Sequence, residues 1–223
     1  MNEALFLAHA IFISAAVLGA CKLGKQALIS LFCLQAFIAN LLLFKQIDFL
    51  GLVITCTDAY AIGCFFSLGL IQYYYGEETA NDAISLCFCL LIFLTITSQI
   101  HLLYEPSRYD TYHPLYKQIF SSTPRILLSS LLIGFTSQKI CVFLQRILSK
   151  KYPRIPQALL ILTPIAIAQA YDTIFFSILA LYGVMHSLVH LIIMSYLVKL
   201  AALASMSPFI ALSKKFKKVP SYE

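Results

Sequence analysis

Long apolar runs occupy most of this chain and limit it to one class of fold. Polar or proline-containing breaks divide it into seven apolar segments, at residues 4–20, 27–44, 49–74, 82–104, 122–148, 156–182 and 185–212. A helix needs about 20 apolar residues to cross a bilayer. Within a bilayer a helix satisfies its backbone hydrogen bonds inside one segment. The pattern therefore predicts an all-α, polytopic bundle of six or seven transmembrane helices.

The composition leaves little material for anything outside the membrane. Hydrophobic residues make up 60% of the 223 residues and charged residues only 12%, whereas soluble domains have about 25% charged residues. We therefore expect a single integral membrane domain over residues 1–223. Its first 20 residues lack the lysine or arginine that begins a signal peptide, which predicts a retained first helix. The tyrosines and prolines of residues 105–121 predict an extramembrane or interfacial loop.

The distribution of positive charge predicts the orientation. Basic residues that flank apolar segments mark cytoplasmic loops, so the net charge of +6 indicates a lipid bilayer and not a nucleic acid as partner. With the N-terminus outside, the cytoplasmic breaks and a basic tail at 213–223 contain Lys22, Lys25, Arg146, Lys150, Lys151, Arg154, Lys214, Lys215, Lys217 and Lys218. The outer breaks contain Lys45, Arg108 and Lys117. This asymmetry predicts a multi-pass protein of the cell inner (cytoplasmic) membrane with a cytoplasmic C-terminus.

Metal and cofactor sites are not indicated. The seven cysteines lie mostly within apolar segments, where the simplest interpretation is small buried hydrophobic residues. His186 and His190 are four residues apart and share a helix face. A zinc site needs three or four ligands, and no third ligand is visible. We expect no metal and no cofactor.

The most informative polar residue is Asp172, because the apolar stretch Ala158–Tyr182 contains no other charge. A carboxylate at the centre of a membrane helix costs about 2.5–3.5 kcal/mol on insertion scales unless it meets a partner or a water-filled cavity. The other charged residues inside apolar segments are Asp58, Arg125, Lys139 and Lys199. Two interpretations remain open: a structural ion pair, for instance between Asp172 and Lys199, or a functional site.

Helical spacing places potential ligand-binding groups beside this carboxylate. Gln169 and Phe176 lie on the same side of the predicted helix as Asp172. A carboxylate can accept two parallel N–H bonds, as it does from a guanidinium, and a guanine-like ring offers such a pair. Aromatic side chains can stack on the faces of that ring. The residue types predict a site for a flat heterocycle, with Arg125 and Lys199 as balancing charges.

These residues resemble the queuosine-precursor transporter family, also described as vitamin uptake transporters. The resemblance runs from about Asn40 to Phe209. It rests on the segment from Gln169 through Tyr171, Asp172 and Thr173 to Phe176, on Pro124-Arg125 with Ser129 and Gln138, on Lys199 in the last helix, on Asn40 with Lys45, and on Tyr75-Gly76 with Ala80. A further stretch with Gln99 and His101 looks most like a branch from intracellular bacteria, which implies salvage of queuine.

The resemblance implies an inner-membrane importer of a 7-deazaguanine-type base (queuine or a queuosine precursor) for tRNA modification, and not an enzyme. No catalytic residue is expected. The implied substrate-binding residues are Asp172, Gln169, Arg125, Lys199, Asn40, Gln138, Thr173, Phe176, Tyr171 and Gln99. Two positions depart from the family pattern: Gly69 and Cys141 stand where many members have an acidic residue, and Asp58 is a candidate partial substitute.

Several alternatives stay open. The plan of about six helices with a small-molecule site also resembles a substrate-binding subunit of an energy-coupling-factor vitamin transporter, which needs a separate energising partner. A homodimer and proton coupling through Asp172 are equally open. An intramembrane enzyme is the remote alternative, because the chain lacks His-Glu-x-x-His and Gly-x-Ser-x-Gly motifs.

Overall fold

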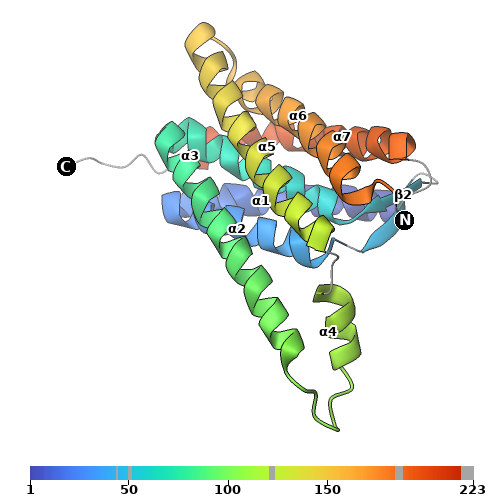
Figure 1. The fold of residues 1–223 in the computed structure, drawn as a ribbon. Helices are drawn as coiled ribbons and strands as arrows, with labels where there is room; N and C mark the ends of the chain where they lie inside the picture. The colour runs from blue at the N-terminus through green and yellow to red at the C-terminus, as the bar shows by residue number, and fades with distance from the viewer. Residues whose placement is uncertain (44, 50–51, 121–123, 184–187, 217–223) are drawn as a thin grey trace.

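The structure is a computed structural model that describes residues 1–43, 45–49, 52–120, 124–183 and 188–216. Helices dominate it (Figure 1). The elements are α1 (Asn2–Leu23), α2 (Lys25–Leu41), β1 (Gln46–Phe49), β2 (Leu52–Thr55), α3 (Thr57–Leu103), α4 (His113–Phe120), α5 (Pro124–Lys151), α6 (Gln157–Phe176), the π-helix η1 (Ser177–Leu181) and α7 (Leu188–Phe216).

Membrane-spanning helices form the body of the molecule. In the part of the chain that the structure describes, α1, α3, α5, α6 and α7 are each long and apolar enough to cross a bilayer. Helix α2 is apolar but shorter, with 17 residues. The prediction of an all-α transmembrane bundle is therefore confirmed, and the chain is a multi-pass membrane protein.

Helix α3 contains a sharp break at Gly76, where the sequence predicts the end of an apolar segment. Gly76 has φ 90° and ψ 168°, and helical geometry resumes directly after it. The second half of α3 then leaves the bundle in a new direction towards α4 (Figure 1). Arg146 of α5 forms an ion pair of 3.2 Å with Glu77, the first residue after the break.

Substitution of Gly76 by alanine is expected to destabilise the fold by about 1–3 kcal/mol, because this backbone conformation is essentially restricted to glycine. A Cβ atom at Gly76 would meet nothing within 4 Å, so the effect comes from the backbone alone. Thermal unfolding in detergent measures it. Gly19→Ala is the matched control, because Gly19 also has open space but lies in regular helix. Equal stability of the two variants would contradict the interpretation.

Two segments differ from the sequence-based prediction. Residues 49 and 52–55 were expected to begin a helix, but they belong to two strands: β1 pairs antiparallel with β2, Gln46 opposite Thr55. Ile47, Phe49 and Ile54 are of types that favour strands, which explains the difference. Residues 105–121 were expected to be a loop, and they contain α4, a helix with no buried residue.

The two ends of the bundle have different character. The hairpin, the N-terminus and the end of α6 lie at one end, which we call the hairpin end (Figure 1). The other end, which we call the basic end, contains the break between α1 and α2, the end of α5 and the end of α7. Lys22, Lys25, Lys150, Lys151 and Lys214 lie in these segments. The closely packed core between the ends includes Phe32, Phe66, Ile71, Ile161 and Met206.

Candidate functional site

A cavity of about 190 Å³ opens among the helices near the hairpin end. Helices α2, α3, α5, α6 and α7 and strand β2 all contribute to its wall. Its apolar surface includes four phenylalanines, Phe65, Phe88, Phe135 and Phe176. Its polar surface includes Asn40, Gln138, Asp58, Asp172, Ser195 and Lys199. An apolar cavity with a few convergent polar groups is the usual form of a small-molecule site.

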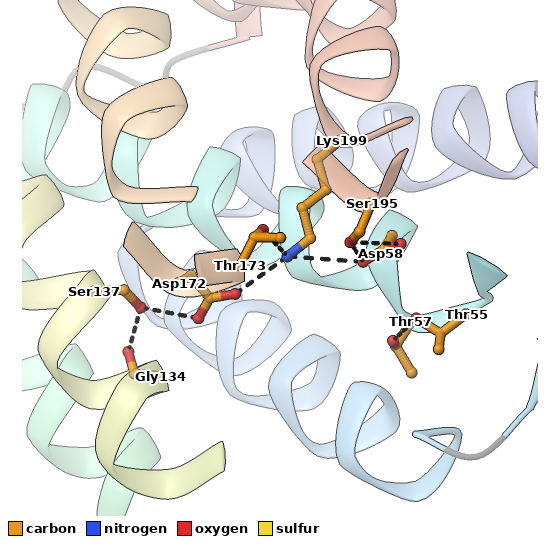
Figure 2. A network of polar contacts seen from close by, with 9 residues as sticks. All are labelled: Thr55, Thr57, Asp58, Gly134, Ser137, Asp172, Thr173, Ser195 and Lys199. Carbon is orange, nitrogen blue, oxygen red and sulfur yellow. Dashed lines mark hydrogen bonds and ion pairs between the residues drawn. The ribbon is translucent and has the colours of Figure 1, made fainter. Parts of the chain in front are cut away.

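Lys199 lies at the centre of the polar wall, between two carboxylates (Figure 2). Its Nζ atom is 3.2 Å from Oδ2 of Asp172 on α6 and 3.7 Å from Oδ1 of Asp58 on α3. It also donates a hydrogen bond of 3.0 Å to Oγ1 of Thr173. One lysine on α7 thus joins three helices, and its buried charge has the paired, hydrogen-bonded environment that a membrane interior requires.

The two carboxylates differ in their surroundings. Asp58 is in the first turn of α3, where the helix dipole favours a negative charge, and Ser195 Oγ lies 3.4 Å from both of its oxygens. Only 7% of the Asp58 side chain is exposed, against 21% of Asp172. Asp172 accepts a hydrogen bond of 3.3 Å from Ser137 Oγ. Asp172 is therefore the more accessible of the two carboxylates.

The chain after Asp172 continues as the π-helix η1, a local widening that often marks functional sites. Arg125 supports this segment: Nε donates to the carbonyl of Leu179, and Nη2 lies 3.5 Å from the carbonyl of Ile178. The side chain of Arg125 thus binds η1. It is not part of the cavity wall and does not balance the carboxylates, contrary to what was expected from the sequence. Lys139 likewise has its own partner, Oδ1 of Asn81, at 2.8 Å.

Six of the ten residues expected from the sequence lie on the cavity wall. These are Asp172, Lys199, Asn40, Gln138, Thr173 and Phe176. Asn40 is held by Ser130, which donates a hydrogen bond of 3.0 Å to its Oδ1. The amide nitrogen of Gln138 points towards Cys64 Sγ at 4.0 Å.

The other four lie elsewhere, among them Arg125. Gln169 is buried one turn below Thr173 and is not part of the wall. Tyr171 faces α5, with its hydroxyl 3.4 Å from Thr136 Oγ1. Gln99 donates to the carbonyl of Phe120 and so connects the second half of α3 with α4.

Three residues that contact Asp172, Lys199 or each other were not among the site residues expected from the sequence: Asp58, Ser137 and Ser195. Asp58 was recognised from the sequence as a charge within an apolar segment. The presence of both acidic and basic residues in these segments indicated ion pairing, and Asp58 pairs with Lys199. Ser195 lies four residues before Lys199, so helical spacing placed it near the lysine but did not show its contact with Asp58. Ser137 carried no signal, and its contact with Asp172 is seen only when the helices are packed together.

Comparison with known proteins places this chain in a family. Residues 59–213 match the model of the family described as "Putative vitamin uptake transporter". The chain belongs to this family. A relative from Bacillus subtilis (strain 168), named "Probable queuosine precursor transporter", is 30% identical over 197 residues, which cover 86% of this chain and 85% of the relative. No solved structure matches the chain.

Family membership makes the chain a transporter and not an enzyme. The structure also locates the residues that depart from the family pattern. Gly69 lies where α3 approaches α6 closely, Cys141 is buried, and Asp58 brings a second carboxylate to the cavity from one end of α3. His190 lies among the described residues but His186 does not, and no cluster of three metal-ligating side chains occurs in the part that the structure describes.

Proposed function

We propose that this protein imports a 7-deazaguanine-type base, queuine or a queuosine precursor, across the inner membrane for tRNA modification. The observation that carries the proposal is the partly exposed carboxylate of Asp172, held by Lys199 on the wall of an otherwise largely apolar, phenylalanine-rich cavity. The name of the Bacillus subtilis relative supports the same substrate class.

The cavity supplies the groups that such a base needs. The ring N–H and exocyclic amine of a guanine-like base form a parallel donor pair, which one carboxylate can accept. Asp172 is the carboxylate with exposed surface for this role. Phe135 and Phe176 offer aromatic surface to the ring, and the amide of Gln138 offers a donor and an acceptor. Lys199 stays paired with Asp58 when the base engages Asp172.

The charge of the cavity favours one subclass of these bases. Among the described residues of its wall, the charged side chains are Asp58, Asp172 and Lys199, which sum to −1; Cys64 and Cys87 are thiols. A buried charge without a partner is unfavourable. A base whose side group carries a protonated amine neutralises the cluster, whereas the cyano precursor does not. We therefore propose the amine-bearing bases, aminomethyl precursor or queuine, as the preferred substrates.

The orientation follows from the same chain features. The basic end holds lysines from four helices, which favours a cytoplasmic position for it. The cavity then lies towards the outer face, with the N-terminus outside and the C-terminus inside. This arrangement corresponds to a state that receives the base from outside, as an importer requires.

Purified protein in sealed vesicles is expected to take up labelled 7-deazaguanine bases without any ATP-hydrolysing partner. The reason is that the described part of the chain holds the cavity within one subunit, and that a relative matched over 85% of its length is itself named a transporter. Uptake into vesicles that contain this chain alone measures it, and empty vesicles are the control. If uptake appears only after an energising module is added, the chain is instead the substrate-binding subunit of a larger transporter.

The direct test of the function is uptake in a strain that lacks its own transporter for these bases. Expression of this chain should restore accumulation of labelled queuine or its precursors and the corresponding tRNA modification. Absence of accumulation for all three bases, with the protein present in the membrane, would refute the proposed function.

A further inference from the structure

Buried glutamines follow a line from the cavity to the basic end of the bundle. In the described residues, every buried side-chain nitrogen or oxygen without a hydrogen-bond partner in the protein belongs to a glutamine. Four of these glutamines are Gln169, Gln145, Gln72 and Gln157, and the fifth, Gln35, donates to Ser67 between α2 and α3. A buried polar group without a partner costs about 1–3 kcal/mol. Their accumulation in an apolar bundle therefore calls for a functional reason.

Helix α6 shows the course of the line. Thr173, Gln169, Ile165, Ile161 and Gln157 are spaced every four residues, so each is the surface neighbour of the next, and all five are buried. At 3.6 residues per turn this row winds about 160° around the helix over its length. The row begins at Thr173, which contacts Lys199 on the cavity wall. It ends at Gln157, about 24 Å away at 1.5 Å per residue, beside the basic end. A winding row of buried α6 residues thus leads from the cavity to the opposite end of the bundle.

The middle of this row is closed by an apolar contact. A Cβ atom on Gly69 of α3 would lie 2.8 Å from Cγ2 of Ile161 and 3.6 Å from Cδ1 of Ile165, so the two helices touch here without intervening space. The contact is flanked by amides, because Gln145 donates to the carbonyl of Gly69 at 3.1 Å. We call Gly69, Ile161 and Ile165 the plug. Such an apolar contact is non-directional, so separating the helices breaks no hydrogen bond between the plug residues.

The basic end of the line is closed by a polar contact. Gln157 donates to Tyr74 Oη at 3.2 Å and to Ser213 Oγ at 3.4 Å, and the two hydroxyls are 2.6 Å apart. These residues join α3, α6 and α7. Pro164 lies between the two plug isoleucines and removes one backbone hydrogen bond from α6, which provides a place where the helix can bend.

We propose that the transported base leaves the cavity along this line, and that the plug is the gate on the basic side. The inference rests on the proposed transport function. When α6 moves away from α3, the amides of Gln169, Gln145 and Gln72 line a polar route. An amide offers both a donor and an acceptor, so it matches the edge of a guanine-like base and also water. It carries no charge, so it holds the base more weakly than Asp172 does, which favours release.

A disulfide across the plug tests the gate. The pair Gly69→Cys and Ile161→Cys is introduced into the otherwise unmodified chain, which keeps Cys64 and Cys87 on the cavity wall. Oxidation should abolish uptake into vesicles, reductant should restore it, and binding of labelled base to the solubilised protein should persist, because the cavity is untouched. The matched control pairs Gly69→Cys with Leu159→Cys, which is exposed on another face of α6.

Two outcomes are decisive. Full uptake with the cross-link complete would refute the proposal that the plug is the gate. Loss of uptake in every variant, including the parent protein without the cross-link, would count against the transport function itself. If the double variant does not fold, Gln169→Cys in the same background replaces it. Gln169→Cys should react with a membrane-impermeant thiol reagent added on the basic side during turnover, and the lipid-facing Ile167→Cys should not. An unreactive Gln169→Cys in a transporting protein overturns the route.

Discussion

Replacing Asp172 by asparagine is expected to lower the affinity for 7-deazaguanine bases by about 10- to 100-fold, because hydrogen bonds to a charged group contribute about 1.5–3 kcal/mol. Asparagine keeps the size of the side chain but offers one acceptor oxygen where the carboxylate offers two. It cannot accept the parallel N–H pair of the ring. Lys199 retains Asp58 as its partner at 3.7 Å, so the lysine is not left unpaired. Concentration-dependent uptake of labelled base measures the effect.

A suitable control is Asp82→Asn, because Asp82 is an exposed acid on the second half of α3, away from the cavity. Uptake by this variant should equal that of the unmodified chain. Unchanged uptake by Asp172→Asn would mean that Asp172 is only the structural half of an ion pair with Lys199.

A triple variant separates the structural role from the binding role. Loss of one member of a buried ion pair leaves the other charge unpaired, whereas loss of both members is often nearly neutral for stability. In the combination of Asp172→Asn with Lys199→Met, Asp58 keeps only Ser195 as a partner, so Asp58→Asn is added. Lys199→Met alone removes the partner of both carboxylates and should lose stability and uptake. If the cluster is purely structural, the triple variant should regain both. We expect it to regain stability alone.

The sequence predicted the membrane fold well because that prediction rests on segment length and polarity. A lipid-facing helix must be apolar over its whole length, so α1, α5, α6 and α7 are visible without tertiary information. The hairpin was missed because Ile47, Phe49 and Ile54 are apolar in either kind of structure. Over so few residues, an apolar run cannot distinguish a strand from the start of a helix.

The candidate site could be predicted only in part. Asp172, Thr173 and Phe176 lie within one turn or so of one another on α6, so helical spacing was sufficient to group them. Gln169 shares that helix face, but the cavity ends above it, and this depends on how closely α3 approaches at Gly69. Arg125 was expected to balance a carboxylate, but it binds a carbonyl of η1 instead. No sequence pattern predicted this π-helix.

We expect Asp58 to decide which bases the cavity favours, with a strong preference for amine-bearing ones. In competition uptake, the aminomethyl precursor and queuine should inhibit at concentrations at least about tenfold lower than the cyano precursor, which corresponds to about 1.4 kcal/mol. The physical reason is the net charge of −1 from Asp58, Asp172 and Lys199, which a protonated amine neutralises. Replacing Asp58 by asparagine makes the cluster neutral, so this variant should lose the preference while it still binds the shared ring edge through Asp172.

The control for this result must disturb Asp58 without changing the charge. Ser195→Ala removes the hydroxyl that lies 3.4 Å from both Asp58 oxygens and leaves the three charges in place. Its inhibition profile should therefore keep the preference for amines, even if overall uptake falls. Equal inhibition by the cyano and aminomethyl precursors in the unmodified chain would show that net charge does not govern selection. Retention of the preference in Asp58→Asn would instead locate the amine-reading group at Asp172 alone, since that carboxylate has the larger exposed surface.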